Sequence, residues 1–568
     1  MAEMSEKLKE AKRLAEFLVA ERSTWDTHHK DITDYICPRY GRYADKGDSD
    51  PNSGKKRMQK VLDGTAMRSL NIAGAGLYSG LCPHSRPWFH MGFMDPDLME
   101  FGPARLWAEA VEKRMYWVLA KSGFYAATHQ NFRELILFAN ATTWASAHNE
   151  NVLHWQTRTW GEYFWGVNGW GEIDTVGVTQ KMPLCGVAQR WGTAAFSTSD
   201  KTRLEKEPYA WTAVTFLVRP RKNYNPERMD NKNMPFEFIA WMEDGQDILF
   251  ESGFNEKPAL TPRWDVVGPS VYGFGLGHDA LPDVKMLQEL QSKRLKGVAL
   301  QIDPPVRVPT GYTRRLLTVP GGQNPVPSQN PDAVGALYQV QVDLRGLLEC
   351  LTDTRNSVRD GFLTPLFLML SDHPEMTATE ALIREQEKLR VLGPVTERLI
   401  GEHLTPALEL VFNEMNRIGM IPPPPPEIRG QQMKIEHVSV LAKAQEAAGF
   451  QGLAQFVTIV TQMAQVDQSV LKKVDSHQVV DEFGKQLGVS PSVVRSDEDV
   501  AKLVQAEQAA IDAQRQGEQL AGMAKTAKDL AGAQMEKPSL LTQAMGGLQQ
   551  GQGGTPPAQT ALPQGRGA

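Results

Sequence analysis

Three short stretches contain the residue types that bind phosphates or activate a serine. Ser53–Lys56 places Lys after Gly as in the last part of a phosphate-binding loop, but Ser49 stands where the first Gly is required and Lys55 is followed by Lys. We interpret it as a solvated loop. Gly74–Gly80 misses the dinucleotide-binding spacing by one residue and lies in a helical pattern, which indicates close helix packing. Gly268–Gly273 is one residue too long for a nucleophile elbow and predicts a turn.

Metal ligands are also poorly grouped. Cys82, His84 and His90 lie near one another but have no fourth ligand nearby. His28-His29 and the pair His148/His154 have no acidic or thiol partner at metal spacing, so we expect ordinary surface or half-buried imidazoles.

The four cysteines, the last of them Cys350, are far apart and form no CxxC pair, which argues against a disulfide framework and fits a reducing compartment. Carboxylates are dispersed. We therefore expect no catalytic, cofactor or metal site, and no enzyme.

Hydrophobic periodicity predicts helices throughout the first quarter of the chain. The expected helices cover residues 8–19, Trp25–Ile36, a segment starting near Val61, Ala104–Lys121 and His129–Trp144. Short β-prone runs separated by Gly, Pro and Asn then predict a β-rich block with hairpins over residues 151–264.

Two further helices flank an insert rich in Pro and Gly. Tyr272–Gly277 is interpreted as a flexible hinge, followed by a helix over Pro282–Gln301, the insert Asp303–Pro331, and a helix over Val342–Asp360. The order is therefore helix, small β excursion, helix.

A long helix should follow the apolar segment Pro365–Leu370. Thr377 and Glu380 form a capping box at its start, and Gly393-Pro394 should kink it before it ends near Arg417. The remaining expected elements are a polyproline spacer at Pro422–Pro426, helices at Ser439–Ala448, Leu453–Gln465 and Asp475–Leu487, a last helix from Ser496 to about Met535, and a disordered tail after Pro538.

Composition restricts the classes of protein. The 568 residues are 41% hydrophobic and 23% charged, which excludes a wholly disordered, collagen-like or coiled-coil chain. A net charge of −6 argues against a strong phosphate binder. The N-terminus lacks the apolar stretch of a signal peptide, and the longest apolar run is far shorter than the roughly 20 residues of a spanning helix, so we expect neither export nor membrane insertion.

Taken together in order, several motifs resemble the head-to-tail connecting protein family, the portal proteins of short-tailed bacteriophages. The motifs are Ala73–Leu81 with Ser85–Phe89; Glu251–Phe254 with Pro258, Arg263-Trp264 and Tyr272-Gly273; Ala280–Asp283; Asp303–Pro305; Met376–Glu380 with Leu392–Pro394; and Lys434–Glu436 through Ala442 and Gln445. One departure is Phe274, where similar proteins often carry Arg.

The resemblance implies a mostly helical α+β portal fold that assembles as a ring of twelve subunits. Its implied parts are a wing (1–281, with the β-rich block 151–264), a first stem helix (282–301), a clip (302–341), a second stem helix (342–361), a channel loop (362–376), a kinked long helix with a return to the wing (377–438), a helical crown or barrel (439–536) and a disordered tail (537–568).

Candidate residues for the DNA channel come from two parts of this implied fold. Lys293, Arg294 and Lys296 cluster on the first stem helix and would either contact phosphates or form a solvated face with inter-subunit ion pairs. Met369, Leu370, Asp372 and His373 would line the channel loop, although Leu366–Leu370 would serve equally well as ordinary core.

The implied function is a portal, or head-to-tail connector, at one capsid vertex of the virion. It would conduct duplex DNA during packaging and ejection, and bind the large terminase motor, tail adaptor proteins and the major capsid or scaffolding protein, after synthesis in the host cytoplasm. Two alternatives stay open: a nucleic-acid-processing motor or nuclease subunit, and another virion structural protein such as a tail adaptor.

Overall fold

The chain forms two units, residues Met1–Asp475 with Glu482–Gly488, and residues Ser476–Asp481 with Val489–Ala568. This computed structural model describes residues 5–43, 60–95, 98, 102–225, 227–228, 230–243, 245, 247–308, 310, 316–317, 323–324, 334–337, 344–368, 392–431, 433–437, 457–460, 462–463, 478–480 and 497–533. It mixes helices and sheets, as the sequence predicts.

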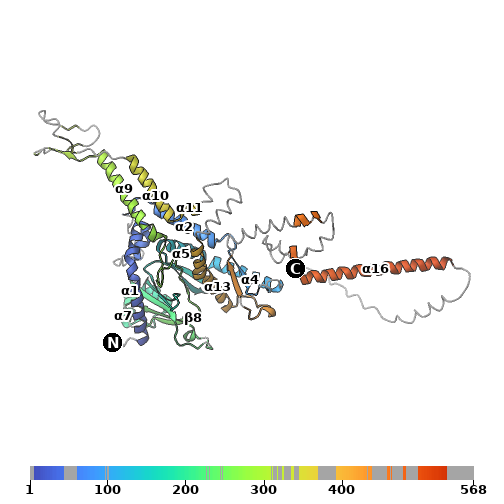
Figure 1. Ribbon diagram of the computed structural model, residues 1–568. Coiled ribbons are helices and arrows are strands. Elements are labelled where there is room, and N and C mark those ends of the chain that lie inside the picture. The colour runs from blue at the N-terminus through green and yellow to red at the C-terminus, as the bar shows by residue number, and fades with distance from the viewer. Residues whose placement is uncertain are drawn as a thin grey trace, which may run out of the picture. The chain divides into compact units, whose positions relative to one another are not determined.

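The first unit contains most of the described helices and all the described strands (Figure 1). The helices are α1 (Glu6–Tyr35), α2 (Thr65–Leu81), α4 (Gly102–Lys121), α5 (Phe124–Phe138), α6 (Leu184–Trp191), α7 (Thr198–Lys206), α8 (Leu276–Asp279), α9 (Leu281–Ile302), α10 (Leu344–Gly361), α11 (Thr364–Leu368) and α13 (Thr405–Arg417). The strands are β1 (Phe89–Phe93), β2 (Thr142–His148), β3 (Val152–Arg158), β4 (Tyr163–Val167), β5 (Ile173–Pro183), β6 (Trp211–Pro220), β7 (Phe236–Met242), β8 (Phe250–Phe254), β9 (Ala259–Leu260), β10 (Val306–Arg307), β11 (Gly335–Ala336) and β12 (Met433–His437).

The largest sheet is antiparallel, five-stranded and ordered β4-β5-β6-β7-β8. A three-stranded sheet has the order β3-β2-β9, and β1 pairs with β12, which is more than 300 residues away along the chain. These pairings join distant segments into one unit.

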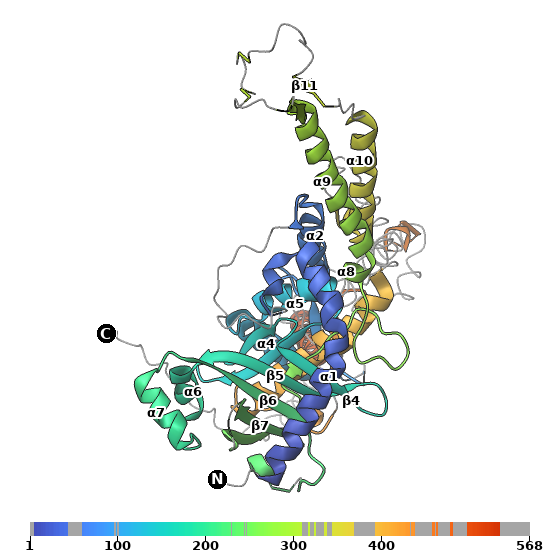
Figure 2. The same cartoon turned by 90° about the vertical axis from the view of Figure 1, so that its left-hand side faces the viewer.

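Helix α1 packs on the large sheet (Figure 2). Leu8, Ala11 and Leu18 recur at helical spacing and contact apolar side chains of the sheet, which are Phe164, Leu217, Ile239 and Trp241. The two helices expected in this region are one continuous helix, because Ser23 and Thr24 donate back to carbonyls one turn earlier and no Pro or Gly interrupts the chain.

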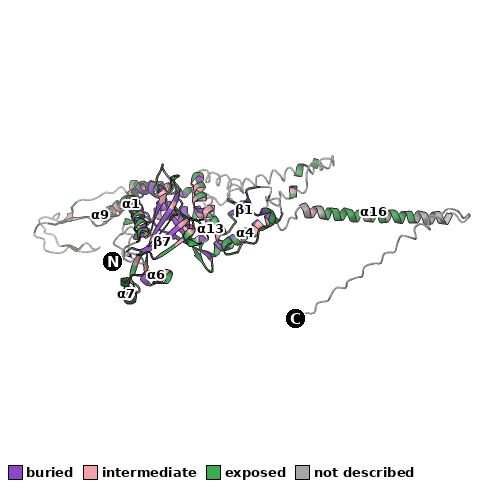
Figure 3. Cartoon of the chain, turned by 90° about the horizontal axis from the view of Figure 1, so that it is seen from below, coloured by how far each residue is buried: buried purple, intermediate pink, exposed green. Residues whose placement is uncertain are grey.

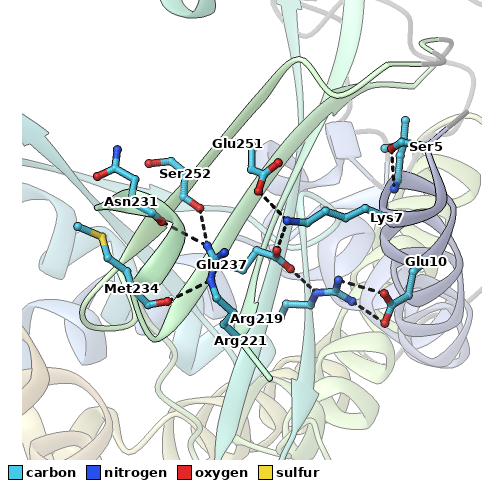
Figure 4. Close-up of polar contacts among 11 residues, drawn as sticks. Ser5, Lys7, Glu10, Arg219, Arg221, Asn231, Met234, Glu237, Glu251 and Ser252 are labelled. Atoms are coloured by element: carbon cyan, nitrogen blue, oxygen red, sulfur yellow. Dashed lines mark hydrogen bonds and ion pairs between the residues drawn. The ribbon is translucent and has the colours of Figure 1, made fainter. Parts of the chain in front are cut away.

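Ion pairs fasten the N-terminal turn of α1 to the same sheet (Figure 4). Lys7 lies between the carboxylates of Glu237 on β7 and Glu251 on β8. Arg219 on β6 contacts Glu237 at 2.9 Å and Glu10 of α1 at 3.2 Å. Burial alone would raise the pKa of Glu237, but its bonds to Lys7 and Arg219 outweigh that effect and hold the pKa below its ordinary value.

The helix predicted over His129–Trp144 is wrong in its second half. Helix α5 ends at Phe138, where Ala139 takes a left-handed conformation, and Thr142 begins strand β2. The reason is tertiary, since the Asn140 side chain donates to the Phe138 and Gly273 carbonyls and accepts from the Gly273 amide. The β-rich region therefore begins at residue 142, before the expected 151.

Two short helices inside the β-rich region were also not predicted. Helices α6 and α7 follow β5 and bury their own small apolar cluster against the end of the sheet. Its buried members are Leu184, Val187, Phe196, Val214, Met242 and Leu249.

The expected flexible hinge at Tyr272–Gly277 is instead a tightly packed junction. Tyr272 is buried, and a Cβ on Gly277 would lie 2.1 Å from the Leu137 carbonyl oxygen. These glycines permit close approach of two backbones rather than movement.

In the second unit, α16 (Asp497–Ala533) is confirmed close to its predicted position. From residue 503 to 524 every residue whose exposure is described is exposed (Figure 3). The helix predicted at Ser439–Ala448 lies outside the described residues, and those at Leu453–Gln465 and Asp475–Leu487 are described only in part.

Candidate functional site

The two long helices that flank the insert are the candidate site. Helices α9 and α10 contact each other and lie side by side in both views (Figure 1, Figure 2). They match the predicted helices Pro282–Gln301 and Val342–Asp360, of which residues 342–343 are outside the described ones. At their far ends β10 pairs with β11.

Burial is confined to one end of this helix pair. The buried residues of α9 lie in its first half, and those of α10 lie at Leu351 and beyond. They are Leu281, Val284, Leu287, Gln288 and Gln291 in α9, with Leu351, Thr354 and Val358 in α10. The other residues of both helices whose exposure is described are half-buried or exposed.

Asp63 links the buried end of the pair to the rest of the unit. One carboxylate oxygen accepts from the Thr65 amide and hydroxyl at 2.9 and 2.6 Å, at the start of α2. The other accepts two bonds from the Arg355 guanidinium of α10 at 2.9 and 2.8 Å. Burial alone would raise the pKa of Asp63, but these bonds outweigh it and hold the pKa below its ordinary value.

Gln288 of α9 binds the same segment. Its carbonyl oxygen accepts from the amides of Leu62 and Asp63 at 2.7 and 2.8 Å, and its Nε2 donates to the Asp63 carbonyl at 2.8 Å. Lys285 also forms a 2.6 Å ion pair with Asp31 of α1. One polar cluster thus fixes α9 and α10 to α1 and α2.

The three predicted channel cations lie beyond this cluster, on the exposed part of α9. Lys293 forms a 2.9 Å ion pair with Glu289, one turn earlier in the same helix, and both side chains are 67% exposed. Arg294 is half-buried and Lys296 is exposed, and neither forms an ion pair with a described residue. The structure therefore brings Lys293 to a partner within its own chain and leaves the other two at the surface.

The other predicted site residues cannot be placed together. Met369, Leu370, Asp372, His373, Thr377 and Glu380 lie outside the described residues. Immediately before them, Leu366–Leu368 belong to helix α11 rather than to a loop, and Phe367 packs against Gly76 of α2. This contact confirms the close helix packing predicted for Gly74–Gly80.

Gly393 and Pro394 lie in a helix of which the residues from 392 onward are described. The irregularity visible here is a π-helical turn at Ile400–Leu404, which sequence reasoning missed. Pro406 lacks the amide hydrogen needed for regular α bonding and was the available signal. Glu402 of this turn binds the Arg263 guanidinium at 2.7 Å and the Arg263 amide at 2.8 Å.

The histidines and cysteines form no chemical site in the described part of the chain. His29 is buried, contrary to expectation, with its Nε2 3.0 Å from Nε2 of His278. Burial lowers the pKa of His278 to about 4 and that of His403 to about 3. No three His, Cys, Asp or Glu side chains among the described residues are arranged to hold a metal ion.

The remaining predicted motifs are structural where they can be seen. Gly268 takes a left-handed conformation in the expected turn, while Ser53–Lys56 lie outside the described residues. Among the described helices, none is both long and apolar enough to cross a membrane. The polar contacts around Asp63 hold the two long helices α9 and α10 at one end.

Comparison with known proteins shows which family the whole chain resembles. The family model for "Bacteriophage head to tail connecting protein" matches residues 8–494. A probable portal protein of Bordetella phage BPP-1 is 33% identical over 540 residues, which are 92% of this chain and 95% of the relative. The portal protein of Salmonella phage epsilon15 is 34% identical over 558 residues, which are 95% and 98% of the two chains. The chain therefore belongs to the bacteriophage head-to-tail connecting protein family.

Proposed function

We propose that this chain is the portal subunit that joins the head of a bacteriophage to its tail. Copies assemble into a twelve-membered ring at one capsid vertex, and the ring conducts duplex DNA during packaging and ejection. Family membership over nearly the whole chain carries the proposal. A protein of this family can act as a connector only when it is bound to a capsid and to a tail.

The anchored helix pair supports α9 and α10 as the channel-forming stem. Twelve helices about 10 Å wide form a circle about 120 Å around and leave an opening near 28 Å. A duplex about 20 Å across passes through such an opening. The Asp63–Gln288–Arg355 cluster holds each pair at its base, so that the exposed ends can meet those of neighbouring copies.

Charge is consistent with a passage rather than a binding site. A net charge of −6 limits the number of phosphates that the chain can neutralise, and each neutralised phosphate would retain DNA in the channel. The phosphates of DNA in the channel would be contacted by Lys293, Arg294 and Lys296. Met369, Leu370, Asp372 and His373 would form the narrow collar of the channel.

The partners follow from the two ends of the stem. The β10–β11 end forms the clip, which would bind first the large terminase motor and later the tail adaptor proteins. The wing, built on the sheets and α1, would face the major capsid or scaffolding protein. ATP hydrolysis belongs to the motor.

Negative-stain microscopy and mass measurement of the purified full-length chain test the proposal. We expect hollow rings of about twelve subunits. A parallel ATPase assay should give no turnover that depends on Lys55, with Lys55→Ala as the matched variant. Solitary chains at high concentration, or ATP turnover abolished by Lys55→Ala, would show that the proposal is wrong and favour a motor subunit.

A further inference from the structure

Trp170 is displayed at the surface by the β4–β5 hairpin. Its side chain is 89% exposed, the most exposed among the large apolar side chains described. A single exposed Trp carries a large contact area at low cost in side-chain entropy, and such residues dominate the energy of many protein interfaces.

The turn that carries Trp170 is rigid. The Asn168 side-chain oxygen accepts from the Trp170 and Glu172 amides at 2.9 and 3.0 Å, and Gly171 takes a left-handed φ of 81° that suits glycine. The Gly171 carbonyl accepts from Arg263, which is itself held by Glu402. The backbone that carries Trp170 is therefore held in place before the side chain meets any partner.

The same unit contains a groove of mixed apolar and polar lining near the end of α13. Its volume is about 480 Å³, a size that accommodates an aromatic side chain. The lining residues are Phe93, Trp107, Phe412, Asn416, Ile421, Pro422, Pro423, Pro424, Ile428, Gly430, Gln431 and Met433.

The groove is preformed and suits an indole. The Trp107 Nε1 donates to the Pro422 carbonyl at 2.9 Å, which fixes the proline wall. Proline rings offer flat apolar surfaces for an aromatic face, and the amide oxygens of Asn416 and Gln431 can accept the indole N–H.

Trp170 cannot fill the groove of its own chain. Its turn is tied through Arg263 to Glu402, just before α13, whereas the groove is lined by residues 412 and 416 of the same helical segment. Ten to fourteen residues of helix separate these positions, which is about 15–20 Å. A rigid turn does not cross that distance.

Charge next to the two features is complementary. Glu172 is exposed beside Trp170, and Arg429 is exposed beside Ile428 of the groove. Neither forms an ion pair with a described residue. A second copy that brings Trp170 into the groove would place these opposite charges on the same rim.

We propose that Trp170 of each subunit inserts into the Pro422–Pro424 groove of the next copy. This contact uses two different surfaces of one chain, so its repetition excludes a two-fold dimer and generates a ring when the rotation between neighbours closes. The inference rests on the proposed ring function and assigns one of its contacts outside the α9–α10 pair.

Substitution of the exposed Trp gives the first test. Trp170→Ala should raise the protein concentration required for half-maximal ring assembly at least about tenfold, measured by mass photometry or sedimentation, without changing thermal stability. Tyr209→Ala, at a side chain 78% exposed on another loop, is the matched control and should leave assembly unchanged. Glu172→Arg should weaken assembly and Arg429→Glu added to it should restore it, whereas Glu427→Gln should not weaken it.

Disulfide trapping gives the second test. In a Cys350→Ser background, the double variant Trp170→Cys with Gln431→Cys should yield a ladder from dimers to closed rings on non-reducing gels. A mixture of the two chains that each carry only one of the introduced cysteines should yield dimers between the two kinds of chain and nothing larger, because each chain then offers only one half of the contact.

The outcomes separate this inference from the proposed function. Wild-type rings by microscopy with no ladder, and a Trp170→Ala variant that assembles normally, would overturn the groove contact and leave the portal function intact. Failure of the wild-type chain to form rings would overturn both.

Discussion

Glu134 is a buried carboxyl whose protonation links pH to stability. It lies on α5, fully buried, and bonds the Thr159 hydroxyl and the Trp160 amide. Burial, assisted by the nearby Glu162, raises the pKa of Glu134 to about 8 from an ordinary 4.5. The folded chain therefore holds a proton there at neutral pH.

Replacement by glutamine should remove this pH dependence. Between about pH 4.5 and pH 8 the unfolded chain releases the proton while the folded chain keeps it, so folding stability falls as pH rises through that window. The free energy of unfolding of Glu134→Gln, taken relative to that of wild type, should be higher at pH 8 than at pH 5. The difference should be on the order of a few kcal/mol. Urea denaturation at both pH values measures this.

The exposed Glu150→Gln provides the control and should follow wild type at both pH values. A Glu134→Gln variant with the same pH profile as wild type would mean that Glu134 is ionised in the folded chain.

At the scale of elements, α2 shows how close helix packing depends on glycine. A Cβ on Gly76 would lie 2.2 Å from the Phe367 ring of α11, whereas a Cβ on Gly80 of the same helix meets nothing within 4 Å. The Phe367 ring therefore requires glycine at position 76, whereas no described residue near Gly80 requires it there.

These two glycines make a matched pair of substitutions. Gly76→Ala should lower the free energy of unfolding by about 1–3 kcal/mol, because the ring must move. Gly80→Ala should raise it by about 0.4–1 kcal/mol, because alanine restricts the unfolded chain. Equal effects in chemical denaturation would show that α11 does not pack on α2.

At the scale of the whole molecule, we expect assembly to depend on the residues before Pro538 and not on those that follow. The residues after Lys537 are rich in Gly, Gln and Pro, a composition that does not favour a packed core. Deletion of residues 538–568 should therefore leave ring formation unchanged.

Mass photometry of the truncated and full-length chains, side by side at several concentrations, measures this. Loss of rings in the truncated chain alone would assign an assembly role to the tail.

The sequence by itself determined the elements whose pattern is local. Periodic apolar residues located α4, α9 and α10 to within a few residues, because a helix buries a stripe that its own spacing defines. The acidic residues that follow Ser496 and the Ala/Gln-rich stretch after them located α16. The order of the family motifs also identified the family.

Only the tertiary structure decided features that depend on distant partners. Asn140 ends α5 by bonding Gly273, and Asp63 is joined to Gln288 and Arg355, more than 200 residues away. The 400–404 π turn and the Trp170 hairpin are likewise held by Arg263 and Glu402. Such contacts produce no repeating pattern in the amino-acid sequence, because the energy of a hydrogen bond depends on where the folded chain places the partner group.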